Sequence, residues 1–178
     1  MFVDNHDTER NGSTLSYADG ELYALANVLM LAGSYGTPVV YSGYAFSDRD
    51  AGPPQDGDGR VVDATCSATP NDGDWVCQHR WPQIAGMVGW RNVVGDAART
   101  DEWSQGDAVA FGRGDRGFVV VNAGDDELRT ELATSLPDGD YCDVLATGDC
   151  AVTTVRDGAL AVEVPPRTAQ AWDVDSRP

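Results

Sequence analysis

The 178-residue sequence contains no lysine, so its 12 basic residues are all arginine, against 29 acidic residues. The formal net charge is −17 at pH 7. Because a phosphate backbone or an anionic membrane surface binds clustered cations, we expect neither nucleic acid nor a membrane as a partner. The acidity is consistent with simple solubility and also with adaptation to high salt, and both explanations stay open.

Long apolar runs are also missing. No apolar stretch reaches the roughly 18–20 residues that a transmembrane helix needs. A basic segment followed by an apolar one, which is typical of a signal peptide, is not visible either. Apolar residues nevertheless make up 42% of the sequence, which is enough for a folded core. We therefore expect one or two folded domains.

Cysteine and histidine are scarce. The four cysteines lie as Cys66 with Cys77 and Cys142 with Cys150, and both spacings are too wide for a CxxC metal site. Two local disulfides are the favoured interpretation, each stabilising the fold by roughly 2–3 kcal/mol, and four free thiols are the alternative. The first pair would close part of a long loop at residues 43–79. Disulfides indicate an oxidising compartment, so we expect a secreted protein.

Residues 1–97 alternate between strand-like and helix-like segments. A short strand is expected around Val3, and a helix over residues 20–32 with Asp19 as its N-cap. A second strand is expected over residues 37–42 and a second helix over 82–94, with a proline in its first turn. Two such units cannot bury both faces of a parallel sheet, so this region indicates part of a larger domain.

After residue 97 the pattern changes to short strands separated by turns. The pair Asp157-Gly158 predicts a two-residue hairpin turn. Strands at this spacing are typical of a β-sandwich or barrel, and we place the second domain at residues 98–178. The predicted strands cover residues 108–111, 117–122, 128–133, 141–146, 151–156, 159–164 and 168–174.

Three polar residues directly follow the first expected strand: Asn5, His6 and Asp7. In βα architectures the reacting groups lie at the C-terminal ends of strands. Asp7 has the chemistry of a general base, nucleophile, metal ligand or charge stabiliser, and His6 that of a hydrogen-bond donor to a substrate oxygen. From the triplet alone, a cap role for Asp7 and a structural role for His6 are the commoner explanations.

The segment FVDNHD at residues 2–7 resembles a motif at the end of a barrel strand in the α-amylase family of glycoside hydrolases. The similarity is closest to the animal-like branch that actinobacteria share. The family fold is a (β/α)8 barrel that carries an antiparallel β-domain. The resemblance therefore implies that residues 1–97 are the C-terminal quarter of the barrel, its last two βα units. It also implies that residues 98–178 form an antiparallel Greek-key β-sandwich. Further similar segments are YGTP at 35–38, SGY at 42–44, AGPP at 51–54, DWVCQHRW at 74–81, WRN at 90–92, AFGRG at 110–114 and LPDGDYCDV at 136–144.

The resemblance implies an α-amylase as the intact protein, which hydrolyses α-1,4-glucosidic bonds of starch, glycogen or maltooligosaccharides internally and with retention. A retaining glycosidase needs a nucleophilic and an acid/base carboxylate about 5–5.5 Å apart. The family takes both from earlier strands, which this chain does not contain. Asp7 corresponds to the third carboxylate, a transition-state stabiliser, and His6 to a substrate-binding histidine. We therefore expect the chain to be inactive alone and to need the missing N-terminal part of the barrel as its partner.

The resemblance also concerns ions and disulfides. Asn5 corresponds to a chloride ligand of the animal-like branch, but Val39 occupies the position of the arginine that this site needs, so weak or absent chloride binding is expected. The family's structural calcium is expected in the intact enzyme, with ligands outside this chain, and no metal site is expected within it. The disulfide pairs implied are Cys66–Cys77 and Cys142–Cys150.

A second class of function is a non-catalytic carbohydrate-binding or structural β-domain with a barrel remnant. Trp103, Tyr141 and Trp172 would then form a sugar-stacking platform, although packing in the core is the commoner role of such residues. We also expect residues 1–97 to expose a large apolar surface and residues 98–178 to fold alone.

Overall fold

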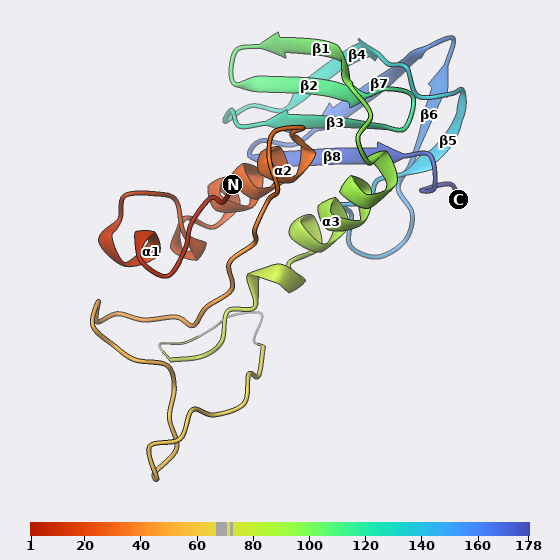
Figure 1. The fold of residues 1–178 in the computed structure, drawn as a ribbon. Helices are drawn as coiled ribbons and strands as arrows, with labels where there is room; N and C mark the ends of the chain where they lie inside the picture. Colours follow the sequence, from red (N-terminus) through yellow and green to blue (C-terminus); the bar gives the residue numbers. More distant parts are fainter. Residues whose placement is uncertain (67–70, 72) are drawn as a thin grey trace.

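The computed structural model describes residues 1–66, 71 and 73–178. Figure 1 shows a helical layer on the outer face of one four-stranded sheet, with a second four-stranded sheet behind it. The loop between the two main helices extends away from these layers (Figure 1). Within the described residues, no helix combines the length and apolarity needed to cross a membrane.

Both expected helices form. Helix α2 spans Glu21–Ala32 and helix α3 spans Pro82–Val94, where the proline occupies the first turn and costs no hydrogen bond. The expected N-cap of α2 is wrong, because Gly20 takes that position. The carboxylate of Asp19 instead accepts a hydrogen bond from the backbone N–H of Ser16 at 2.8 Å. Three shorter helices also form: α1 (Thr8–Asn11), η1 (Tyr17–Asp19) and η2 (Gln78–Arg80).

The strands expected around Val3 and over residues 37–42 are not formed, and this corrects the sequence interpretation. The two segments do lie together, since the N–H of Val39 donates to the carbonyl of Met1 at 2.8 Å and the terminal ammonium donates to Thr37 at 2.9 Å. These bonds do not continue into a ladder. A parallel pair needs neighbouring strands and covering helices on both sides, so two isolated extended segments do not make a sheet.

The antiparallel β-sandwich expected after residue 97 is confirmed. The second sheet places its strands in the order β4-β7-β6-β5, which is a Greek-key arrangement. The first sheet has the order β1-β2-β3-β8, and its strands are β1 (Arg99–Gln105), β2 (Ala108–Arg113), β3 (Gly117–Asn122) and β8 (Thr168–Asp173). The strands of the second sheet are β4 (Leu128–Ala133), β5 (Gly139–Cys142), β6 (Val152–Arg156) and β7 (Ala159–Val164).

Two strand predictions need correction. The sequence analysis missed β1, whose residues are polar or charged apart from Trp103, because an edge strand that pairs with β2 alone needs few apolar side chains. The strand predicted over 141–146 ends at Cys142, since the carboxylate of Asp143 accepts the N–H of Leu145 at 3.0 Å and turns the chain. The predicted Asp157-Gly158 turn is confirmed, with φ of 52° and 72° at its two residues.

The core between the two sheets contains large side chains from both. Tyr141 and Trp172 are 0% and 1% exposed and lie in this core with Phe118. The hydroxyl of Tyr141 donates to the carbonyl of Pro137 at 2.7 Å. These two aromatic residues therefore pack inside the sandwich, and Trp103 of β1 is partly buried against the same core. Core packing, the commoner of the two roles considered for these residues, is thus the one observed.

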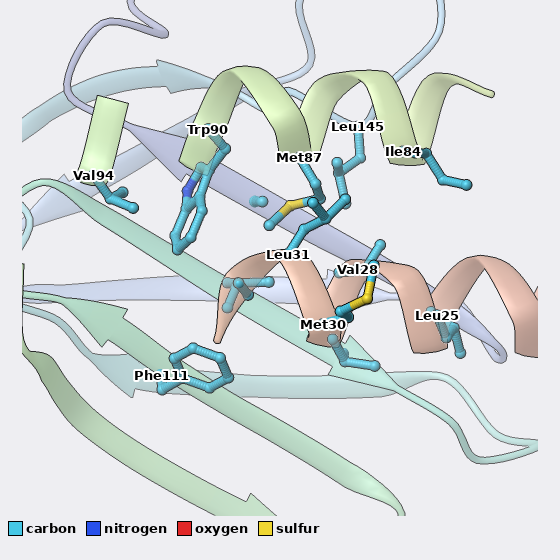
Figure 2. Packing of buried hydrophobic residues seen from close by; sticks show 14 of the residues in the cluster. Leu25, Val28, Met30, Leu31, Ile84, Met87, Trp90, Val94, Phe111 and Leu145 are labelled. Carbon is cyan, nitrogen blue, oxygen red and sulfur yellow. The ribbon is translucent and has the colours of Figure 1, made fainter. Parts of the chain in front are cut away.

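A second core lies between the helices and the outer face of the first sheet, as Figure 2 shows. Strand β3 is buried on both faces, because Phe118 points into the sandwich while Val119 and Val121 pack toward the helices. Trp90 of α3 packs against β3, and its indole N–H donates to the carbonyl of Trp172 at 2.8 Å. The apolar packing thus crosses residue 97.

Candidate functional site

The residues expected to carry the chemistry lie in a turn that leads into α1. The side-chain oxygen of Asn5 accepts the backbone N–H groups of Asp7 and Thr8, both at 2.9 Å. The hydroxyl of Thr8 in turn accepts the N–H of Asn5 at 2.9 Å. This reciprocal pair fixes the turn at the start of a four-residue helix. An anion at Asn5 would have to use its side-chain NH2 group.

His6 and Asp7 are brought together on the outside of this turn. Their side chains are 76% and 79% exposed, and the Nε2 atom of His6 lies 3.6 Å from the Oδ2 atom of Asp7. An exposed pair of this kind adds little to stability. Both side chains are therefore accessible to a ligand that carries hydroxyl groups.

Two acidic residues that the sequence analysis did not single out are buried on either side of the exposed pair. Asp4 is 2% exposed and Glu9 is 7% exposed. The hydroxyl of Tyr23, on α2, donates to the Oδ1 atom of Asp4 at 2.9 Å. The hydroxyl of Tyr41 donates to the Oε1 atom of Glu9 at 3.1 Å. The position of Asp4 directly after the apolar run Met1-Phe2-Val3 was the one sequence signal for its burial.

The protonation of these carboxyl groups is shifted by their surroundings. Burial raises the pKa of Asp4, and the hydrogen bond from Tyr23 opposes this shift. Burial also raises the pKa of Glu9, and the negative charge of Asp4 acts in the same direction. The second oxygen of each carboxyl, Oδ2 of Asp4 and Oε2 of Glu9, has no hydrogen-bond partner. The turn is therefore flanked by two buried carboxyl groups whose pKa values lie above the ordinary values for Asp and Glu.

Arg10 is a further residue of the site that sequence reasoning missed. It projects from α1 to the loop at residues 43–51, where it donates to the carbonyl of Ala51 at 2.9 Å and to the hydroxyl of Tyr44 at 2.7 Å. The site turn and this loop are thus in direct contact. The carbonyl groups and the phenol ring that bind the guanidinium carry no sequence signature, which explains why the contact was not predicted.

The structure adds little for ion binding. The side chain of Val39 is apolar and 57% exposed, so it supplies neither a charge nor a donor. Among the residues that the structure describes, no three histidine, cysteine or acidic side chains are grouped as metal ligands. Calcium and chloride therefore stay predictions that depend on the family resemblance.

Both expected disulfides are formed, so the alternative of four free thiols is wrong. Cys66–Cys77 joins positions whose Cα atoms are 5.5 Å apart and closes part of the long loop. Cys142–Cys150 joins positions 5.0 Å apart and closes the turn that follows β5.

The fold is thus an antiparallel β-sandwich that shares an apolar core with the helices α2 and α3 before it. Residues 101–175 match the family model described as the α-amylase C-terminal all-β domain. The chain is 45% identical to an α-amylase of Streptomyces violaceus over 99% of its own length and 29% of that protein. It is 43% identical to an α-amylase of Tenebrio molitor over 89% of its length and 35% of that protein.

A solved structure agrees with these sequence matches. α-Amylase I from Eisenia fetida superposes with a TM-score of 0.89 at 32% identity, over 97% of this chain and 40% of that one. Its E249Q variant was solved in complex with maltohexaose. The chain therefore belongs to the α-amylase family and spans about a third of the length of its curated relatives.

Proposed function

We propose that the chain is the last part of the catalytic barrel and the β-domain of a secreted α-amylase that hydrolyses α-1,4-glucosidic bonds of starch, glycogen or maltooligosaccharides with retention. One observation carries this proposal. The similarity to the Streptomyces violaceus α-amylase covers 99% of the chain, so it includes the Asn5-His6-Asp7 turn as well as the β-domain. The two disulfides support an extracellular location.

In the proposed reaction, Asp7 and His6 act on the sugar in the cleavage subsite. Positive charge develops at the anomeric carbon in the transition state, and the fixed carboxylate of Asp7 stabilises it. His6 donates a hydrogen bond to a sugar hydroxyl. The hydrogen bonds that Asn5 accepts hold the turn from which both side chains point outward. The nucleophile and the acid/base come from the part of the barrel that this chain does not contain.

The exposed apolar residues near the first segment support a missing neighbour. Phe2 and Val39 are half exposed, and Tyr35 is 82% exposed. The segments that carry Phe2 and Val39 also lack the ladder that strands of a barrel would share. Further barrel strands would cover this surface and complete these hydrogen bonds. Calcium in the intact enzyme and weak or absent chloride binding are part of the same proposal.

A chimeric enzyme tests the proposal. The chain would replace the matching segment of the Streptomyces violaceus α-amylase, and reducing ends released from starch would be measured. We expect the chimera to be active and the chain alone to be inactive. Asp7→Asn should lower the kcat of the chimera by a factor on the order of 100–1,000. The exposed Asp115, in the β2–β3 turn, provides a matched control through Asp115→Asn, which should leave kcat unchanged.

Three outcomes would contradict the proposal. These are a folded but inactive chimera, robust starch turnover by the chain alone, and a chimera whose activity is insensitive to Asp7→Asn. The anomer of the released sugar, followed by NMR, would separate retention from inversion.

A further inference from the structure

Arg10 is half-buried and makes three hydrogen bonds and two cation–π contacts. Its Nη1 atom donates to the carbonyls of Arg49 at 2.5 Å and Ala51 at 2.9 Å, and its Nη2 atom donates to the hydroxyl of Tyr44 at 2.7 Å. The guanidinium carbon also lies 4.1 Å from the ring centre of Phe46 and 5.1 Å from that of Tyr44. All of these partners belong to one loop, so the side chain joins α1 to that loop at several points.

The loop that Arg10 holds is itself fixed by the first disulfide. The ring of Tyr44 packs edge-on against Trp75, with ring centres 5.7 Å apart, and the two residues form an isolated β-bridge. Trp75 forms a second bridge with Cys66 and lies two positions before Cys77, the other half of the disulfide. A continuous set of contacts therefore runs from the disulfide through Tyr44 to Arg10.

Arg10 is also close to the site turn in sequence. It follows Asp7 by three positions, and its backbone N–H donates to the carbonyl of Asp7 at 3.2 Å. The helix α1 has only four residues, so its own hydrogen bonds do not hold it rigidly. Contacts with other segments, such as those of Arg10, therefore add to the order that the Asn5–Thr8 bonds give the turn.

We propose that Arg10 is a positioning residue, which ties the Asn5-His6-Asp7 turn to Tyr44 and, through Trp75, to the Cys66–Cys77 disulfide. Lysine cannot replace it, because an ammonium group lacks the planar set of donors and the stacking face that the guanidinium uses here. The role of Asp7 in this inference rests on the proposed function, but the ordering of the turn by Arg10 does not.

Backbone dynamics of the chain test the inference directly. NMR order parameters would be measured for the N–H groups of Asp7 and Thr8, with those of β3 as an internal reference. We expect values near 0.85 in the unchanged chain and below about 0.6 in Arg10→Lys, while the β3 values stay the same. Arg116→Lys is the matched control, since Arg116 also donates to a backbone carbonyl, that of Val93 at 2.7 Å. It should leave the turn unchanged.

A comparison of combined variants tests whether the disulfide affects the turn through Arg10. Removing the disulfide by Cys66→Ser with Cys77→Ser should lower the order parameters of Asp7 and Thr8 when Arg10 is kept. The same removal should have no added effect in Arg10→Lys, because the connection is already lost. If the cysteine variant fails to fold, Tyr44→Phe replaces it, since this change deletes one bond of the same path.

Two results would overturn the inference: order parameters of the turn that do not change in Arg10→Lys, and a loss that is equally large in Arg116→Lys. In the active chimera, Arg10→Lys should lower kcat about 10–100-fold, with a smaller change in KM. An inactive chimera together with the expected order parameters would contradict the proposed function and leave the role of Arg10 intact.

Discussion

Arg113 is predicted to hold the helical layer on the β-sandwich. It is 2% exposed, and its guanidinium donates to four backbone carbonyls and, within the described residues, to no carboxylate. Two acceptors lie at the end of α2, Ala32 at 3.0 Å and Gly33 at 3.3 Å, and two follow α3, Gly95 at 2.9 Å and Ala97 at 2.7 Å. The partial negative charge at the two helix ends therefore takes the place of a counter-ion for the buried cation.

The size of the effect follows from these contacts. Arg113→Met keeps much of the apolar contact but removes every donor. The carbonyl of Ala32 is buried and would be left without this partner, at about 1–3 kcal/mol. Water can reach the other three carbonyls in part, so the loss of each of these bonds costs less. The loss of the positive charge at the two helix ends costs about 0.3–1 kcal/mol more at each end. We expect the free energy of unfolding to fall by about 3–5 kcal/mol.

Urea unfolding followed by tryptophan fluorescence measures this loss, because Trp90 and Trp172 lie in the two cores. Arg129→Met is the control. Arg129 also makes two side-chain hydrogen bonds, but both are exposed ion pairs, so its loss should leave the free energy of unfolding nearly unchanged. A loss for Arg113→Met no larger than for Arg129→Met would refute the reasoning.

Two further predictions concern packing and pH. Gly86→Ala should lower the free energy of unfolding by about 1–3 kcal/mol in the same urea assay, because a Cβ atom there would collide with the carbonyl of Val144. Gly89→Ala, where the added methyl group meets nothing, should instead be neutral or stabilising. Asp4 and Glu9 have raised pKa values in the folded chain, so they bind protons more tightly when folded. Their contribution to stability is present below their ordinary pKa values of 3.8 and 4.5 and is lost as pH rises through the folded pKa values. Asp4→Asn with Glu9→Gln should flatten this part of the curve of urea midpoint against pH, and an unchanged slope would contradict the assignment.

Local sequence signals predicted the parts of the fold that local interactions determine. The helix that begins at Pro82 and the turn at Asp157-Gly158 formed as expected, because each depends on backbone preferences of a few neighbouring residues. Strand β3 was predicted with its exact ends, since its apolar run is bounded by turn residues on both sides. Strand β1 was missed because its pairing with β2 decides its conformation, and its own polar composition does not.

The candidate site shows this difference between local and long-range interactions more strongly. The resemblance directed attention to Asn5, His6 and Asp7, and the structure places all of them in one turn. The residues that support this turn could not be found from the sequence. Arg10 binds partners about 35–40 positions away, and carbonyl acceptors are present at every residue, so nothing in the sequence distinguishes the ones used.

The residues that support the site also connect the β-domain to the first 97 residues. Arg113 on β2 holds the C-terminal end of α2, and Tyr23 of the same helix donates to Asp4, directly before the site turn. The β-sandwich is thus connected through one helix to the residues that precede Asp7. Residues 98–178 alone would uncover Val119 and Val121, so their predicted independent folding would expose an apolar sheet face that α2 and α3 now bury. The change in sequence pattern near residue 97 marks a change in secondary structure, whereas the physical unit that positions the turn extends across it.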